Sequence, residues 1–134
     1  MTRPEEAHER RGRMSKFMIS FGTSAMDHIS DEDMPAVANA AHDVVQQILN
    51  AGVYVLAGGL ENRRSSIVAT DGTVTDGPEP EAIGGVTVVE VSSREEALEW
   101  AAKIAVACRC AQEVWEIRLD PELETMIRQA GRRN

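Results

Sequence analysis

The spacing of apolar residues alternates between a period of two and a period of about 3.6, and this alternation restricts the possible folds more than any other feature. Residues 16–21 (KFMISF) alternate as in a strand with one buried face. Between residues 35 and 49, apolar side chains recur at steps of three and four, which predicts an amphipathic helix that ends at Gly52. Residues 53–57 (VYVLA) predict a second strand, apolar enough to be covered on both faces.

The same order recurs in the second half of the chain, after a hairpin. Asp71–Gly72 separates two short runs of β-prone residues and predicts a two-residue type I′ turn, which needs positive φ at both positions. Residues 92–95 (SSRE) predict a capping box at the start of a helix. The other predicted elements are strands at 86–91 and 113–119, the end of that helix near Cys108, and a short terminal helix at 121–129.

The order β-α-β, hairpin, β-α-β predicts an α+β fold of the ferredoxin-like type, with an antiparallel sheet and both helices on one face. Apolar residues also alternate onto the other face, and we assign Val53, Val55, Val86 and Val88 to it. A monomer rarely leaves an apolar patch of this size in water. We therefore expect a second copy of the chain to cover this face, sheet against sheet, in a homodimer.

Length and charge limit the class of protein. The 134 residues fit one domain, in which we expect a disordered N-terminal tail (1–15), a folded domain (16–120) and a C-terminal extension (121–134). The formal net charge of −8 disfavours nucleic acid as a partner, because phosphates require clustered Lys and Arg. No apolar run approaches the roughly 18–20 residues of a membrane span, so we expect no membrane partner. Only two cysteines, Cys108 and Cys110, predict a reduced, cytoplasmic protein.

Three motifs together carry a resemblance to a known family. They are Asp76-Gly77-Pro78 after Thr73-Val74-Thr75, the Gly84–Gly85 pair before a valine-rich strand, and the helical segment 96–104 (EALEWAAKI). In this combination, residues 16–119 resemble the YCII-related, or DGPF-domain, proteins, a family of small bacterial proteins. The resemblance implies a ferredoxin-like protomer in a dimeric α/β barrel, and a cleft between sheet and loops. It implies no established activity.

The chain departs from the family pattern at two points. Glu79 stands where the family has Phe after Asp-Gly-Pro, and His42 is out of register with the histidine of the family's His–Asp pair. We therefore do not assign the family's His–Asp pair to residues of this chain.

Three residues are candidate acid–base groups. His28 follows Asp27 in the loop after the first strand, where an imidazole could act near neutral pH or be merely solvent-exposed. His42 lies at the margin of the apolar stripe of the first helix, and a half-buried structural histidine is the alternative. Asp76 could accept a proton or a hydrogen bond at the mouth of the cleft, or bond its own backbone in an Asx-turn.

Glu61, Arg63 and Arg64 follow the second strand and, with Asp76, are candidate ligand-binding residues. An Arg at this place could hold an anionic group in a bidentate manner, whereas a solvated surface loop is the structural alternative. The sequence contains no GxGxxG, P-loop or HExxH pattern, so we expect neither a cofactor nor a metal.

The two cysteines and the two tryptophans have competing interpretations. Cys108 and Cys110 flank Arg109, so one of them could be a reactive thiolate beside a cation, or a small residue buried at a helix end. Trp100 and Trp115 are expected to be packing or dimer-contact residues.

Three functional interpretations stay open. The first, which we prefer, is a homodimer with a small-molecule-binding cleft. The second is a cofactor-independent enzyme that acts on a small organic substrate, with His28 or His42 and Asp76 as acid–base groups. The third is a protein-interaction module.

Overall fold

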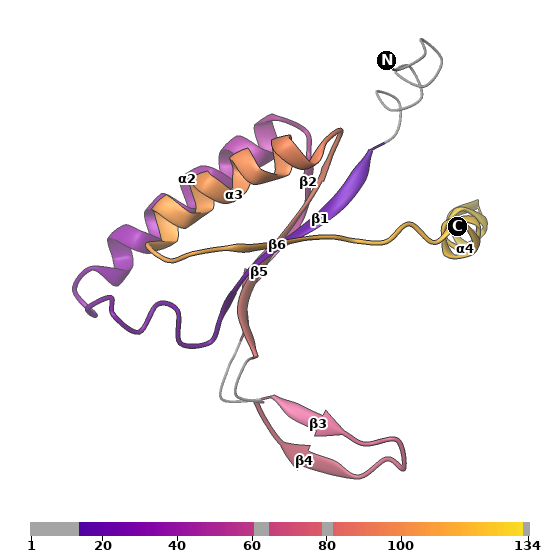
Figure 1. The fold of residues 1–134 in the computed structure, drawn as a ribbon, viewed down its shortest axis with the longest axis horizontal. Helices are drawn as coiled ribbons and strands as arrows, with labels where there is room; N and C mark the ends of the chain where they lie inside the picture. Colours follow the sequence, from indigo (N-terminus) through magenta and orange to yellow (C-terminus); the bar gives the residue numbers. More distant parts are fainter. Residues whose placement is uncertain (1–13, 61–64, 79–81, 133–134) are drawn as a thin grey trace.

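The computed structural model describes residues 14–60, 65–78 and 82–132, which form three helices and two sheets (Figure 1). In chain order the elements are β1 (Ser15–Gly22), α2 (Met34–Asn50), β2 (Tyr54–Gly59), β3 (Ser66–Val68), β4 (Val74–Asp76), β5 (Ile83–Val91), α3 (Arg94–Cys108), β6 (Glu113–Glu116) and α4 (Pro121–Arg132). The order of strands and helices is the predicted one, with the hairpin formed by β3 and β4 between the two β-α-β halves.

The larger sheet has the strand order β2–β5–β1–β6 and is antiparallel throughout. The helices α2 and α3 lie side by side and cover one of its faces (Figure 1). This arrangement confirms the predicted α+β fold of the ferredoxin-like type. The described part of a single chain closes no barrel. No helix within the described ranges has the length and apolar character to cross a membrane.

The hydrophobic core lies between the sheet and the two helices, and the period-two alternation of the strands creates it. Phe17 and Ile19 of β1 are each 1 % exposed, and Phe17 lies opposite Val89 of β5, which is completely buried. Ile48 of α2 packs into the same cluster. Each such side chain contributes about 1.5–3 kcal/mol by leaving water. The alternate residues of β1, such as Met18, necessarily point to the opposite face.

The predicted stop of α2 is present, and the capping box of α3 lies one residue later than predicted. Ser93 Oγ accepts a hydrogen bond from the Glu96 N–H (3.1 Å), and the Glu96 carboxylate accepts one from the Ser92 N–H (3.2 Å). The predicted capping box therefore lies one residue later, because Ser93 has the extended N-cap backbone. Gly52 follows α2 with φ of +74°, which confirms the predicted stop.

The β3–β4 hairpin exists as predicted, but its turn is of another type. Among the described residues other than glycine, only Arg109 has a positive φ, so Asp71 cannot occupy a type I′ turn. Gly72 has φ of +90°, the Gly72 N–H donates to Ala69 O, and the Ala69 N–H donates to Thr73 O. This is a three-residue loop that ends in a left-handed glycine. Asp71 Oδ1 accepts from the Thr73 N–H (2.9 Å), and the hydrogen bonds with Thr73 lower the Asp71 pKa.

The face of the sheet away from α2 and α3, called here the open face, is partly apolar. By register it carries Met18, Val86 and Val88 in the two central strands, with Leu56 and Trp115 on the two edge strands. Leu56 is 45 % and Trp115 56 % exposed. By register the predicted face is confirmed for Val86 and Val88, and Val88 is 7 % exposed.

Two of the four valines that we assigned to the open face, Val53 and Val55, do not follow the simple alternation of faces. The assignment of Val53 is wrong, because this side chain is 7 % exposed within the core cluster on the helical side. Val55 lies where the pairing of β2 with β5 shifts register between Tyr54 and Leu56. Such a bulge adds one residue to a strand and interrupts the strict alternation of faces, which the sequence pattern did not reveal.

The last strand is shorter than predicted and leads to a separate helix. β6 ends at Glu116, and beyond it the Ile117 N–H still donates to Lys16 O (2.8 Å). Residues 117–120 then run away from the sheet, and α4 lies on the side opposite α2 and α3 (Figure 1). Asp120 Oδ1 accepts from the Leu123 N–H (3.1 Å), which caps α4 at its start.

Gly84 and Gly85 allow two segments to approach more closely than any side chain permits. A Cβ atom at Gly84 would lie 2.8 Å from the carbonyl oxygen of Gly22 and 2.9 Å from Thr23 Cα. At Gly85, a Cβ atom would lie 2.3 Å from the tip of the Phe21 ring, which fills that space. The glycine pair of the family motif thus serves the packing of β5 against β1 and the loop that follows it.

We predict that Gly84→Ala lowers the free energy of unfolding by about 1–3 kcal/mol, the usual cost of overpacking. The obstructing atoms belong to the backbone and cannot rotate away. Gly58→Ala in β2 is the matched control, because a Cβ atom there meets nothing within 4 Å. Urea unfolding of both variants measures the difference, and equal stabilities would contradict the role assigned to Gly84.

Candidate functional site

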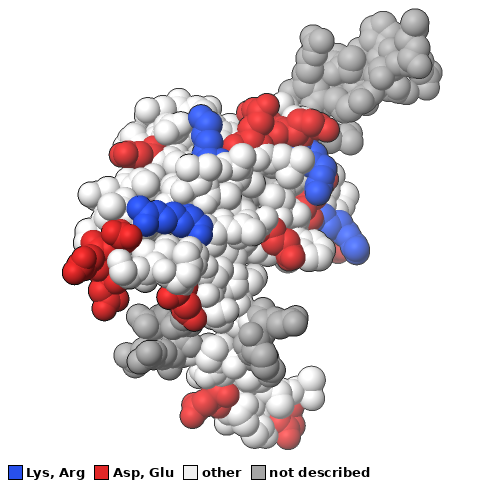
Figure 2. Space-filling view, turned by 60° about the vertical axis from the view of Figure 1, so that its left-hand side comes forward, with Lys and Arg blue, Asp and Glu red and all other residues white. Residues whose placement is uncertain are grey.

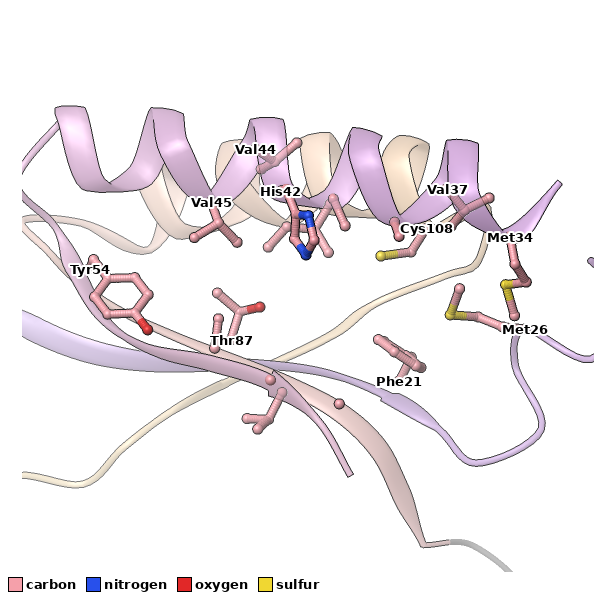
Figure 3. Close-up of a pocket in the computed structure, with 17 residues that line it drawn as sticks. Phe21, Met26, Met34, Val37, His42, Val44, Val45, Tyr54, Thr87 and Cys108 are labelled. Atoms are coloured by element: carbon pink, nitrogen blue, oxygen red, sulfur yellow. The ribbon is translucent and has the colours of Figure 1, made fainter. Parts of the chain in front are cut away.

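A cavity of about 460 Å³ lies between α2 and the sheet, beside the edge strand β2 (Figure 3). Pockets for small molecules commonly have volumes of about 300–1,000 Å³. Its apolar lining comes from α2, from both strands of the β2–β5 pair, from α3 and from the end of β1 with its following loop. The larger apolar side chains are those of Phe21, Met26, Met34, Val37, Val44, Val45 and Ile104.

Three polar side chains line this otherwise apolar space. His42 projects from α2 toward the sheet, and Tyr54 and Thr87 approach from the sheet below it (Figure 3). An imidazole, a phenol and a hydroxyl can each donate or accept a hydrogen bond. No Lys, Arg, Asp or Glu belongs to the described lining. The cavity therefore combines apolar walls with uncharged or weakly basic hydrogen-bonding groups.

Strand register and small residues together create the cavity. Thr87 lies opposite Ala57 on β2, and Tyr54 lies opposite the buried Val89, so both polar side chains share the helix-covered face. On α2, Ala38 and Ala41 occupy the facing positions. Because alanines face each other across the two layers, side chains do not fill the gap, and space remains between helix and sheet.

The structure places the predicted acid–base residues in different parts of the molecule. His42 lines the cavity and is exposed rather than half-buried, whereas His28 is exposed in the loop between β1 and α2. Asp76 is exposed at the end of β4, opposite Ser66, in the separate two-stranded sheet of β3 and β4, called here the β3–β4 ribbon. Neither His28 nor Asp76 belongs to the described lining of the cavity with His42. Glu61, Arg63 and Arg64, the candidate ligand-binding residues, lie outside the described residues, as does Glu79.

The Asp76-Gly77-Pro78 motif has a structural role, because Gly77 contacts Ser65 where the two strands of the ribbon begin and end. The Gly77 N–H donates to Ser65 O (3.0 Å) at the base of the ribbon. A Cβ atom at Gly77 would lie 2.2 Å from Ser65 Oγ, so glycine allows the two segments to meet. The Asx-type hydrogen bond that we considered for Asp76 is seen at Asp71 instead.

Sequence reasoning missed Tyr54 and Thr87. Both are polar residues inside strands that otherwise read as apolar (VYVLA and VTVVEV), and this is the signal that could have found them. It does not identify the site by itself, because the bulge in β2 and the strand register decide which face each side chain takes.

The surroundings of the two cysteines do not favour a reactive thiolate. Burial raises the pKa of Cys108, with a further contribution from Cys110, and burial also raises the pKa of Cys110. The guanidinium of Arg109 donates instead to the Asp33 carboxylate (3.2 Å). The alternative is confirmed for Cys108, which is buried at the end of α3.

The charged side chains of the described surface lie outside the cavity. On the face drawn in Figure 2, basic side chains are scattered among more numerous acidic ones. No group of three or more His, Cys, Asp or Glu side chains within the described ranges is arranged to hold a metal ion. The cavity is therefore the part of the described chain best suited to a ligand.

The fold and the cavity define a class: a small α+β protein with a ferredoxin-like sheet, two helices on one face and an apolar pocket between the layers. The family model of the YCII-related domain matches residues 24–118, most of the chain. The chain belongs to the YCII-related domain family, in agreement with the resemblance carried by its motifs. No curated protein matches the chain.

We predict that both cysteines of the native protein react with iodoacetamide several-fold more slowly than in the urea-unfolded chain at the same pH. A raised pKa means a smaller thiolate fraction at neutral pH, and burial restricts access. The rate should keep rising with pH beyond the point where a free thiol reaches its plateau. Mass spectrometry of alkylated peptides measures each cysteine separately. Alkylation of native Cys108 as fast as in the unfolded chain would contradict this assignment.

Proposed function

We propose that the protein is a homodimer that binds a small, largely apolar molecule, with one hydrogen-bonding group, in the cavity beneath α2. The observation that carries the proposal is the presence of His42, Tyr54 and Thr87 in an otherwise apolar cavity. A few polar groups on apolar walls are typical of sites that bind small organic molecules. The apolar walls supply affinity, and the polar side chains orient the ligand.

The charge of the lining selects the class of ligand. Without Lys or Arg in the described lining, a phosphate or a dicarboxylate would lose its hydration and gain no countercharge. A neutral ring or branched chain with a hydroxyl or carbonyl group loses little on entry and hydrogen-bonds to the three polar side chains. The described lining therefore favours a ligand that is neutral or carries at most one charge.

The acid–base hypothesis raised from the sequence pairs a histidine with Asp76, and it requires that carboxylate to lie close to His42. The described lining contains no carboxylate, and Asp76 belongs to the β3–β4 ribbon. Binding is accordingly the function that the geometry supports best, and no chemical step is assigned to the site.

The open face of the sheet supports the homodimer. Leu56 and Trp115 expose about half of their surface there, beside Met18, Val86 and Val88. Two such faces stacked sheet on sheet would remove the exposed side chains, above all Leu56 and Trp115, from water, and one patch would serve both copies around a two-fold axis. The helices and the cavity lie on the other side of the sheet, so the cavity stays accessible in this dimer.

We predict that 2-naphthol binds the protein about tenfold more tightly than naphthalene, because one added hydrogen bond contributes about 0.5–1.5 kcal/mol. His42→Gln should reduce this preference. His28→Gln is the matched control, because this histidine is not part of the lining. Ligand-observed NMR measures all six affinities, two compounds with each of three proteins. Failure of both compounds to bind, or equal binding of the two by the wild type, would contradict the proposed ligand class.

We predict that sedimentation gives twice the chain mass of 14.6 kDa for the wild type and a monomer for Leu56→Lys. A lysine buried in the interface would lose its hydration. Leu49→Lys is the matched control, because Leu49 on α2 is 47 % exposed and Leu56 45 %. A wild-type monomer at micromolar concentration, or a dimeric Leu56→Lys variant, would overturn the sheet-to-sheet dimer.

A further inference from the structure

The helix α4 carries an apolar stripe that its own chain leaves largely exposed. Leu123, Met126 and Ile127 recur at the three- and four-residue spacing of one helical face and are 49 %, 59 % and 56 % exposed. No other described helix or strand packs extensively against α4. An isolated helix shorter than about 12–15 residues is marginal in water, so a helix of this length needs a surface to pack against.

The segment that leads to α4 also exposes apolar side chains. Ile117 and Leu119 follow the end of β6 at Glu116 and are 44 % and 60 % exposed. A groove of about 390 Å³ is lined by these two side chains, by Leu123 and Ile127 of α4 and by Met14 before β1. Charged side chains line it as well, those of Lys16, Glu90, Glu116, Arg118, Asp120 and Glu124. The apolar stripe of α4 thus lies beside a groove of mixed apolar and charged character.

The position of α4 indicates what covers the stripe. α4 stands away from the sheet on the open side, opposite α2 and α3 (Figure 1). Stacked sheets pack about 10 Å apart, so a second sheet on the open face would occupy the space alongside α4. We infer that α4 is an arm that packs its Leu123–Met126–Ile127 stripe against the second copy of this chain. The inference rests on the homodimer proposed above and extends it to the C-terminal helix.

The charges along this surface fit an identical partner. α4 carries Glu122 and Glu124 near its start and Arg128 near its end. The groove beside it carries Lys16 and Arg118 together with Glu90, Glu116 and Asp120, so acidic side chains outnumber basic ones. A two-fold interface brings each patch against its own copy, so a patch that carries both signs can pair with itself. A surface of one sign would repel its copy instead.

Hydrogen exchange tests whether α4 depends on the partner. In the wild type, above the dimer dissociation constant, we expect the α4 amides to be protected, and in Leu56→Lys we expect them to exchange at rates close to those of an unfolded peptide. The amides of α2 and α3 serve as the internal control and should stay protected in both proteins. Protection of α4 in the monomeric variant would show that it packs on its own chain and would overturn the inference. Unprotected α4 amides in a wild-type dimer would also overturn it.

Substitutions in the stripe test its contribution to assembly. The double variant Leu123→Gln/Ile127→Gln should raise the dimer dissociation constant by about ten-thousandfold, since burial of each side chain contributes roughly a factor of ten and the dimer contains two copies of each. Thr125→Gln, on the opposite side of α4, is the control and should leave it unchanged. A dimer unaffected by the double variant, but dissociated by Leu56→Lys, overturns the arm and leaves the proposed dimer intact. A wild-type monomer overturns both.

Discussion

The antiparallel pairing of β1 with β5 at the centre of the sheet is the constraint on which the rest of the structure depends. It runs from Ser15 opposite Val91 to Gly22 opposite Ile83, and both strands are flanked by further strands. Because side chains alternate, this register sends Phe17 and Val89 toward the helices and Met18 toward the open face. A slip of one residue would exchange the two faces and expose the core. Both surfaces to which we assign a function follow from this pairing.

Close packing and open space occur at neighbouring places along β5. At Gly85 the absence of a side chain lets the Phe21 ring lie against the strand, and Phe21 then forms part of the cavity lining. Two residues further, Thr87 faces the small side chain of Ala57, and no large group fills the gap below α2. The family motif therefore acts on the site through packing, since its glycines position a wall of the cavity without contacting a ligand themselves.

The elements were predictable because their signals are local. The period of two in KFMISF, the helical spacing after Pro35 and the stop at Gly52 depend on nearby residues only. The errors were local as well: the capping box lies one residue later, and the Asp71–Gly72 turn has a longer loop with one left-handed residue. For the candidate site, His42 was found as a polar residue at the edge of an apolar stripe. Its neighbours Tyr54 and Thr87 were not found, because the sequence does not state which strands lie beneath α2.

By itself, the sequence determined the order of strands and helices, the fold type and the family, since periodicity, turn residues and motifs are properties of neighbouring residues. Only the tertiary structure decided that Val53 belongs to the core, that His42 shares a cavity with Tyr54 and Thr87, and that Asp76 lies in a separate ribbon. These facts depend on strand register and on one bulge in β2, which bring together residues far apart in the chain. A binding site is formed by residues that are far apart in the sequence, whereas a helix or strand is formed by residues that are neighbours in it.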